Sequence, residues 1–173
     1  MQKLLTAALL AVTAFSSASP ALADITPAVA QEHNNLVAAL AARGISLHLD
    51  AAICKSNPID GLYHGASRSL VICNGGSTEM TENNLDTLRH EAVHFMQDCR
   101  DGVVDGNLTT VLKPGQARAM LASSGQDPTW IERVYTSHGK EAHVPYEEEA
   151  FGIAAVVSPG TIISALNIFC PVD

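Results

Sequence analysis

The pattern of hydrophobic and polar positions predicts a short strand region followed by several helices. Apolar residues recur at helical spacing over residues 28–43, and Gly44 then favours the end of a helix. Residues 45–49 alternate between apolar and polar side chains and residues 69–73 form a denser apolar run, so both are predicted as strands, with turn residues over 57–61 between them. Strands followed by helices indicate an α+β fold with a short mixed sheet and a C-terminal helical part. The later predicted helices run from Thr81 to about Arg100 and over residues 114–124, 128–137 and 146–157.

The N-terminal segment has the pattern of a secretory signal peptide. Lys3 is followed by an apolar run over residues 4–15 and then by small residues that end in Ala21-Leu22-Ala23, a typical cleavage site. The run is too short for a membrane-spanning helix, which needs about 20 apolar residues. We therefore predict a signal peptide over residues 1–23, a single domain over residues 24–173, and a secreted or periplasmic location.

The composition narrows the classes of partner. The chain of 173 residues has 10 Lys and Arg against 18 Asp and Glu, for a formal net charge of −8. Binding to nucleic acid or to an anionic membrane surface needs clustered basic side chains, so neither is expected as a partner of the mature protein. Hydrophobic residues make up 47% of the chain and charged residues 16%, which favours a folded chain over a disordered one.

All four cysteines lie in the predicted mature region, which favours two disulfides in an exported protein. Four cysteines allow three pairings, and the sequence alone does not choose among them. We expect the local pair Cys54–Cys73 and the distant pair Cys99–Cys170, which would tie the C-terminal tail to the core. A zinc site built from cysteines is the alternative, although no two of them have the close spacing typical of such sites.

The segment His90-Glu91-Ala92-Val93-His94 carries the main chemical motif. Histidines four residues apart lie on one face of a helix, so both imidazoles can bind one zinc ion. Glu91 is rotated by about 100° from His90, which suits a carboxylate that contacts a zinc-activated water rather than the metal. The apolar positions of this helix lie opposite the two histidines, which favours a metal pair over histidines packed in the core or lying on the surface. These positions are Leu85, Leu88, Ala92, Phe95, Met96 and Cys99.

A catalytic zinc site needs a third protein ligand and one open position. Candidates are Glu147, Glu148 and Glu149, in a predicted helix that begins near Pro145. Glu147 lies on the apolar face of that helix, whereas Glu148 and Glu149 rotate away from it and suit a solvated helix start. A buried carboxylate needs a partner such as a metal ion, so we predict Glu147 as the ligand and keep the other two as alternatives. The residues that share the face of Glu147 are Ala150, Phe151 and Ala154.

The motif HEAVH followed by a Glu-x-Glu-Ala segment on a later helix resembles the gluzincin branch of the zincin metallopeptidases. The resemblance covers about residues 61–157, and the run HEAVHFMQDC is also similar to small secreted zincin-like proteins of bacteria. It implies a small zincin-like domain with an active-site helix, in which Gly61–His64 and Ser69–Ile72 resemble the turn and the edge strand of the cleft. Many gluzincins have Asp or Asn four residues after the ligand glutamate, where this chain has Phe151.

The resemblance implies a secreted zinc-dependent peptidase that hydrolyses peptide bonds by a zinc-activated water. Zinc would be held by His90, His94 and Glu147, Glu91 would act as general base, and a peptide or protein would be the substrate. Two other hypotheses stay open, namely a catalytically silent zinc-binding protein and a metal-free, disulfide-stapled interaction domain. The candidate oxyanion donors, which spacing does not separate, are Tyr146, His143, His138 and Tyr135. The remaining histidines, expected to be ordinary exposed side chains, are His33, His48 and His64.

Overall fold

The computed structural model describes residues 25–77 and 79–172. The predicted signal peptide and its cleavage site lie outside these residues. Within the described part of the chain, no helix combines the length and the apolar character that crossing a membrane requires.

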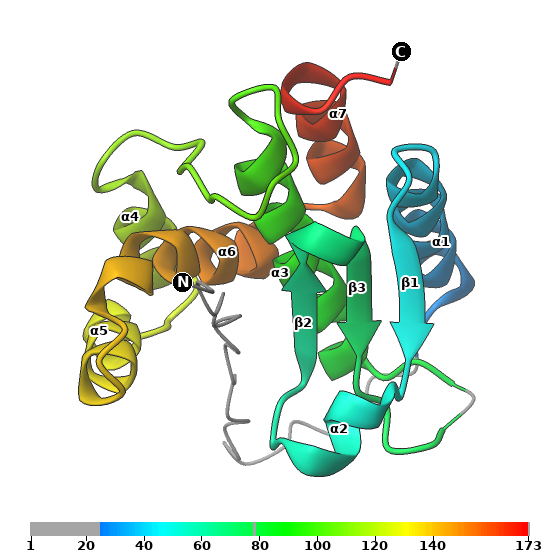
Figure 1. Cartoon of the computed structure of the whole chain (residues 1–173), viewed down its shortest axis with the longest axis horizontal. Coiled ribbons are helices and arrows are strands. Elements are labelled where there is room, and N and C mark those ends of the chain that lie inside the picture. The colour runs from blue at the N-terminus through cyan, green and yellow to red at the C-terminus, as the bar shows by residue number, and fades with distance from the viewer. Residues whose placement is uncertain (1–24, 78, 173) are drawn as a thin grey trace, which may run out of the picture.

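A three-stranded mixed sheet forms from β1 (Ser46–Leu49), β2 (Gly61–His64) and β3 (Ser69–Ile72). The strand order is β1-β3-β2, with β1 parallel and β2 antiparallel to the central strand β3 (Figure 1). The α+β prediction is confirmed, but the expected edge strand is wrong, because β3 lies in the centre and β2 at the edge. A dense apolar run such as Leu70-Val71-Ile72 is typical of a central, buried strand, and these three residues are all buried.

Helix α3 (Glu82–Cys99) contacts both β2 and β3 and forms the centre of the molecule. Thr81 caps its N-terminus: its side chain accepts a hydrogen bond from the Asn84 backbone N–H, and the Asn84 side chain accepts one from the Thr81 N–H. Every residue from His90 to Cys99 is buried, so the histidine face is covered as well as the apolar face. The helix is therefore a central helix, and its amphipathic pattern does not mark a solvent-facing side.

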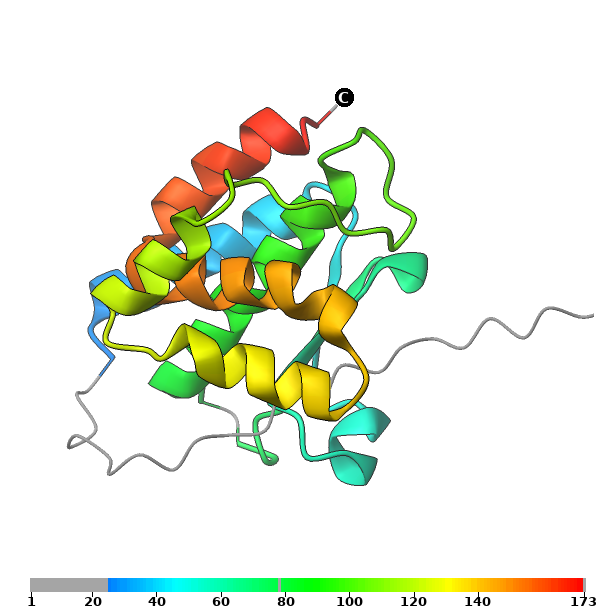
Figure 2. The ribbon, with the colours of Figure 1, turned by 90° about the vertical axis from the view of Figure 1, so that its left-hand side faces the viewer.

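The remaining helices pack around α3 and the sheet. Helix α6 (Val144–Val156) lies across α3 and runs between α4 (Gln116–Ser123) and α5 (Pro128–Ser137), as Figure 2 shows. Two short 3₁₀ turns, at Gly65–Ser67 and Glu141–His143, complete the connections. The other helices are α1 (Pro27–Ala41), which contacts β1 and α7, the short α2 (Ala52–Ser56), and α7 (Pro159–Phe169), which also contacts α3.

Two disulfides join Cys54 to Cys73 and Cys99 to Cys170, as the sequence analysis expected. Cys99 ends the central helix α3, and Cys170 directly follows α7. Closing so long a segment of chain stabilises a fold by about 4 kcal/mol through the entropy of the unfolded state. Two disulfides are also typical of an oxidising environment outside the cytoplasm.

Candidate metal centre

His90, His94 and Glu147 converge at the contact between α3 and α6. Among the described residues they form the only group of three His, Cys, Asp or Glu side chains that is arranged to hold a metal ion. The two histidines are each 5% exposed and Glu147 is 1% exposed. The Nε2 atoms of His90 and His94 lie 3.1 Å apart, and they lie 3.4 Å and 3.5 Å from the two carboxylate oxygens of Glu147.

These separations fit a shared metal ion better than they fit direct hydrogen bonds. Zinc binds imidazole nitrogen at about 2.0–2.1 Å, so two ligand atoms of a tetrahedral site lie about 3.3 Å from each other. Both carboxylate oxygens of Glu147 are buried without a hydrogen-bond partner among the described residues. Since a buried carboxylate that accepts no hydrogen bond is costly, these two oxygens indicate that a cation belongs between them and the imidazoles.

The electrostatics of the group reflect this convergence. Burial alone would lower the pKa of His94, but the facing carboxylate of Glu147 outweighs it and raises the pKa to about 9. Burial would likewise raise the pKa of Glu147, yet His94 and His90 hold it well below its ordinary value. In the metal-free group a cationic imidazole of His94 therefore faces the carboxylate of Glu147. A bound divalent cation would take the place of the proton on that imidazole.

Glu91 lies beside this group without joining it. It is 3% exposed, and burial raises its pKa, although the neighbouring His90 and His94 act in the opposite direction. A hydrogen bond from the Tyr63 backbone also reaches its carboxylate. Gly61 on β2 makes room for it, because a Cβ there would come within 3.0 Å of Glu91 Oε1 and would collide with the Thr87 methyl group.

The three consecutive glutamates all lie in the interior. Glu147 faces α3, as predicted, but the expectation that Glu148 and Glu149 face solvent is wrong, since they are 7% and 1% exposed. The helix α6 contacts α3, α4 and α5, so residues about 100° apart around its axis each meet a different neighbour. A helix surrounded in this way has no solvated face.

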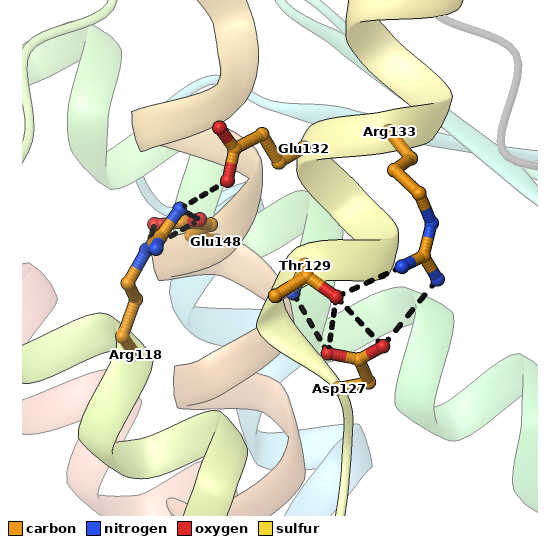
Figure 3. A network of polar contacts seen from close by, with 6 residues as sticks. All are labelled: Arg118, Asp127, Thr129, Glu132, Arg133 and Glu148. Atoms are coloured by element: carbon orange, nitrogen blue, oxygen red, sulfur yellow. Dashed lines mark hydrogen bonds and ion pairs between the residues drawn. The ribbon is translucent and has the colours of Figure 1, made fainter.

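Glu148 points to α4, where Arg118 bonds both of its carboxylate oxygens at 2.9 and 3.0 Å. The same guanidinium reaches Glu132 on α5 at 2.8 Å, so Arg118 links α4, α5 and α6 (Figure 3). Figure 3 also shows Asp127 capping the first turn of α5 through Thr129 and receiving a contact from Arg133. These contacts hold the helices around the site and do not reach the metal group.

Glu149 and Gln97 form a second buried pair, which the sequence analysis missed. Gln97 is fully buried and lies between His94 and Glu149, within 2.8 Å of each. The sequence contained a sign of the contact between Gln97 and His94. Gln97 follows His94 by three residues and therefore lies on the same face of the helix.

Tyr135, one of the four candidate oxyanion donors, lies near the ligand group, since Glu147 and Glu91 both influence its hydroxyl. It is 4% exposed, its hydroxyl has no hydrogen-bond partner within hydrogen-bonding distance among the described residues, and burial together with Glu147 raises its pKa. His138 is exposed, and Tyr146 and His143 are half-buried. Tyr135 is thus the candidate donor that faces Glu147.

The other histidines lie away from the site, but one prediction about them is wrong. His33 is buried rather than exposed, because its Nδ1 donates to the Val29 carbonyl at 2.8 Å and its Nε2 lies 2.9 Å from an Arg89 nitrogen. His48 is exposed and His64 is half-buried. None of the three belongs to the His90, His94 and Glu147 group.

Comparisons with family models, with curated proteins and with solved structures find no match to this chain. The type of site is therefore inferred from the residues that form it. Two histidines one turn apart on α3 and a glutamate on α6, all buried and converging, are consistent with a zincin-like metal site.

Proposed function

We propose that this chain is an exported zinc-dependent peptidase that acts on peptides or unfolded polypeptides. The observation that carries the proposal is the convergence of His90 Nε2, His94 Nε2 and the Glu147 carboxylate, with Glu91 beside them but outside the group. Three protein ligands leave one position of a tetrahedral site open, which is the arrangement of a catalytic rather than a structural zinc. Zinc bound there would polarise a scissile carbonyl and lower the pKa of a water molecule.

Glu91 is the residue we assign to proton transfer. A general base works best when its pKa lies near the working pH, and burial moves the pKa of Glu91 in that direction. It would accept the proton of the attacking water and pass it to the leaving amine. Gly61 and the Tyr63 backbone hold its carboxylate against β2, so it reaches the site without competing as a ligand.

Tyr135 is the residue we assign to stabilising the developing oxyanion. Burial and the nearby Glu147 raise the pKa of its hydroxyl, so it stays protonated and can donate a hydrogen bond. Within the described structure, the Tyr135 hydroxyl makes no hydrogen bond to another side chain.

A second candidate function is a catalytically silent zinc-binding protein. It is favoured by the burial of the group, since His90, His94, Glu91 and Glu147 are all 5% exposed or less. A structural zinc usually has four protein ligands, however, and a scaffold has no need of a buried carboxylate at Glu91. The two disulfides are consistent with an exported protein in both cases. A peptide or protein substrate is proposed as the partner of the peptidase only.

The test compares the wild type with Glu91→Gln, and uses Glu82→Gln as the control because Glu82 is an exposed glutamate on the same helix. Elemental analysis should find about one zinc per chain in all three proteins. Hydrolysis of an unfolded polypeptide should fall by about 10²–10⁴-fold in Glu91→Gln alone. Full zinc content without hydrolysis by the wild type would favour the silent protein, and failure to take up zinc would reject both functions.

A further inference from the structure

Gln97 makes a set of hydrogen bonds that determines how His94 is presented. Its side-chain oxygen lies 2.8 Å from His94 Nδ1. Its side-chain nitrogen lies 2.9 Å from the Tyr146 carbonyl oxygen and 2.8 Å from Glu149 Oε2. The side chain has no exposed surface, so water does not replace any of these partners.

The chemistry of the partners fixes the orientation of this amide. A backbone carbonyl only accepts hydrogen bonds, so the Gln97 NH₂ group must face Tyr146 and Glu149. The Gln97 oxygen must then face His94, and because this oxygen also only accepts, His94 Nδ1 must carry a proton. When the ring is neutral, His94 Nε2 is thereby the nitrogen whose lone pair is available to a metal ion.

We propose that Gln97 is a positioning residue that holds His94 as an Nε2 ligand, and that Glu149 in turn holds Gln97. The proposal rests on the metal site proposed above and adds to it how one ligand is oriented. Hydrogen bonds of this kind to a ligating imidazole fix its ring and increase its basicity.

The support of Gln97 extends to the segment that precedes α4. Glu149 accepts hydrogen bonds from the Val111 and Leu112 backbone N–H groups at 3.0 and 2.5 Å. The Gln97 backbone carbonyl accepts another from the Thr109 N–H at 3.0 Å. Residues 109–112 are therefore connected to His94 through two buried side chains.

The other histidine has no such support. His90 Nδ1 is buried without a hydrogen-bond partner among the described residues, and Phe151 packs against its ring. The two histidines thus differ in the hydrogen bonding of Nδ1, and removing Gln97 should affect the ring of His94 but not that of His90.

The first measurement uses the metal-free protein, so it does not depend on zinc uptake. In a long-range ¹H–¹⁵N NMR spectrum of the wild type, recorded at a pH above the pKa of His94 so that its ring is neutral, we expect the ring ¹⁵N shifts to show a protonated Nδ1 and an unprotonated Nε2. Gln97→Met, which is similar in length but cannot accept the Nδ1 proton, should lose this tautomer preference, while Glu148→Gln should keep it because Glu148 bonds Arg118 instead. The opposite tautomer in the wild type, or an unchanged preference in Gln97→Met, overturns the proposal.

The second measurement is zinc affinity, determined by competition with a chelator. Gln97→Met should bind zinc about 10–100-fold more weakly than the wild type, and Glu148→Gln within about twofold of it. Circular dichroism checks that each variant is folded. A folded Gln97→Met with unchanged zinc affinity overturns the proposal, whatever the outcome for hydrolysis.

A pair of charge-exchanged variants keeps the test informative if Gln97→Met does not fold. Gln97→Glu would place a second carboxylate against Glu149, so it should weaken zinc binding strongly. Adding Glu149→Gln should recover part of that loss, because an amide then donates to the carboxylate that accepts from His94. If the double variant binds zinc no better than Gln97→Glu, the proposed link from Glu149 to His94 is wrong.

Discussion

The ring of Phe151 packs edge-on against the imidazole of His90, with 4.4 Å between the ring centroids. On its other side Phe151 contacts Trp130 of α5, with ring centroids 6.1 Å apart. The chain contains a single tryptophan, so its fluorescence reports on one place only, separated from a proposed zinc ligand by one aromatic ring.

We therefore predict that metal binding changes the emission of Trp130. Cobalt(II), which replaces zinc at histidine and carboxylate sites and quenches nearby fluorescence, should lower the emission with a stoichiometry of about one ion per chain. Titration of the fluorescence measures this directly. Glu147→Gln should require much more cobalt for the same quenching, and equal titration curves for the two proteins would place the ion elsewhere.

The adjacent residues Glu147 and Glu148 provide a matched pair of substitutions. Glu147→Gln removes a carboxylate that faces both imidazoles, so zinc affinity should fall by about 100-fold or more, beyond the usual effect of losing an indirect partner. Glu148→Gln should leave zinc affinity nearly unchanged and lower the free energy of unfolding by about 1 kcal/mol, because its partner Arg118 is half exposed.

Chelator competition and urea unfolding distinguish these effects. A large loss of zinc affinity in Glu148→Gln would mean that α6 is rotated relative to α3. Comparable unfolding free energies for Glu148→Gln and the wild type would mean that the Arg118 contacts contribute nothing measurable.

The residues that could be predicted from the sequence are those whose position follows from spacing within one helix. His90, His94 and the inward direction of Glu147 follow from helical periodicity, and the cap at Thr81 follows from local hydrogen bonding. Glu148 and Glu149 were placed wrongly because their burial depends on α4 and on residues 109–112, which no local pattern positions.

The sheet shows the same limit. The run of residues 69–73 indicated a strand, but whether it lies at the edge or in the centre depends on a third strand. That strand, Gly61–His64, is short and starts with a glycine, so its pattern resembled a turn. Its glycine is required by the approach of Glu91 and Thr87, a tertiary contact that only the folded structure shows.

Zinc binding should release a proton at pH 7.5. The Glu147 carboxylate outweighs burial and raises the pKa of His94 to about 9 in the metal-free protein, so its imidazole is protonated at that pH. Zinc needs the neutral ring and must displace this proton. The apparent zinc affinity should therefore rise by up to about tenfold per pH unit as the pH increases towards the pKa of His94, and then level off.

Calorimetry in two buffers with different ionisation enthalpies measures the released protons. With about one proton released, the observed heat should differ between the buffers by about the difference between their ionisation enthalpies. In Glu147→Gln the carboxylate that raises the pKa of His94 is absent, so the buffer dependence should shrink. An identical heat in both buffers for the wild type contradicts the predicted charge state.

A last prediction concerns access of a polypeptide to the buried site. Tyr135 faces Glu147 from α5, and Trp130 of the same helix packs on Phe151, so α5 lies over the ligand group. This helix buries only Ile131 and Tyr135, and glycines with positive φ, Gly125 and Gly139, lie near its two ends.

If the proposed peptidase admits its substrate on this side, α5 would have to move away from α6. A helix that buries few residues opens at a lower free energy than a central helix, so backbone amides of α5 should exchange with deuterium faster than those of α3. We expect a difference of more than about tenfold, or about 1.4 kcal/mol in opening free energy. Hydrogen exchange followed by mass spectrometry tests this, and a bound peptide inhibitor should change exchange in α5 while leaving α7 unaffected. If α5 is as protected as α3 and the protein nevertheless cleaves polypeptides, the substrate would instead reach Glu91 from the side of β2, where the glycine Gly61 lies against its carboxylate.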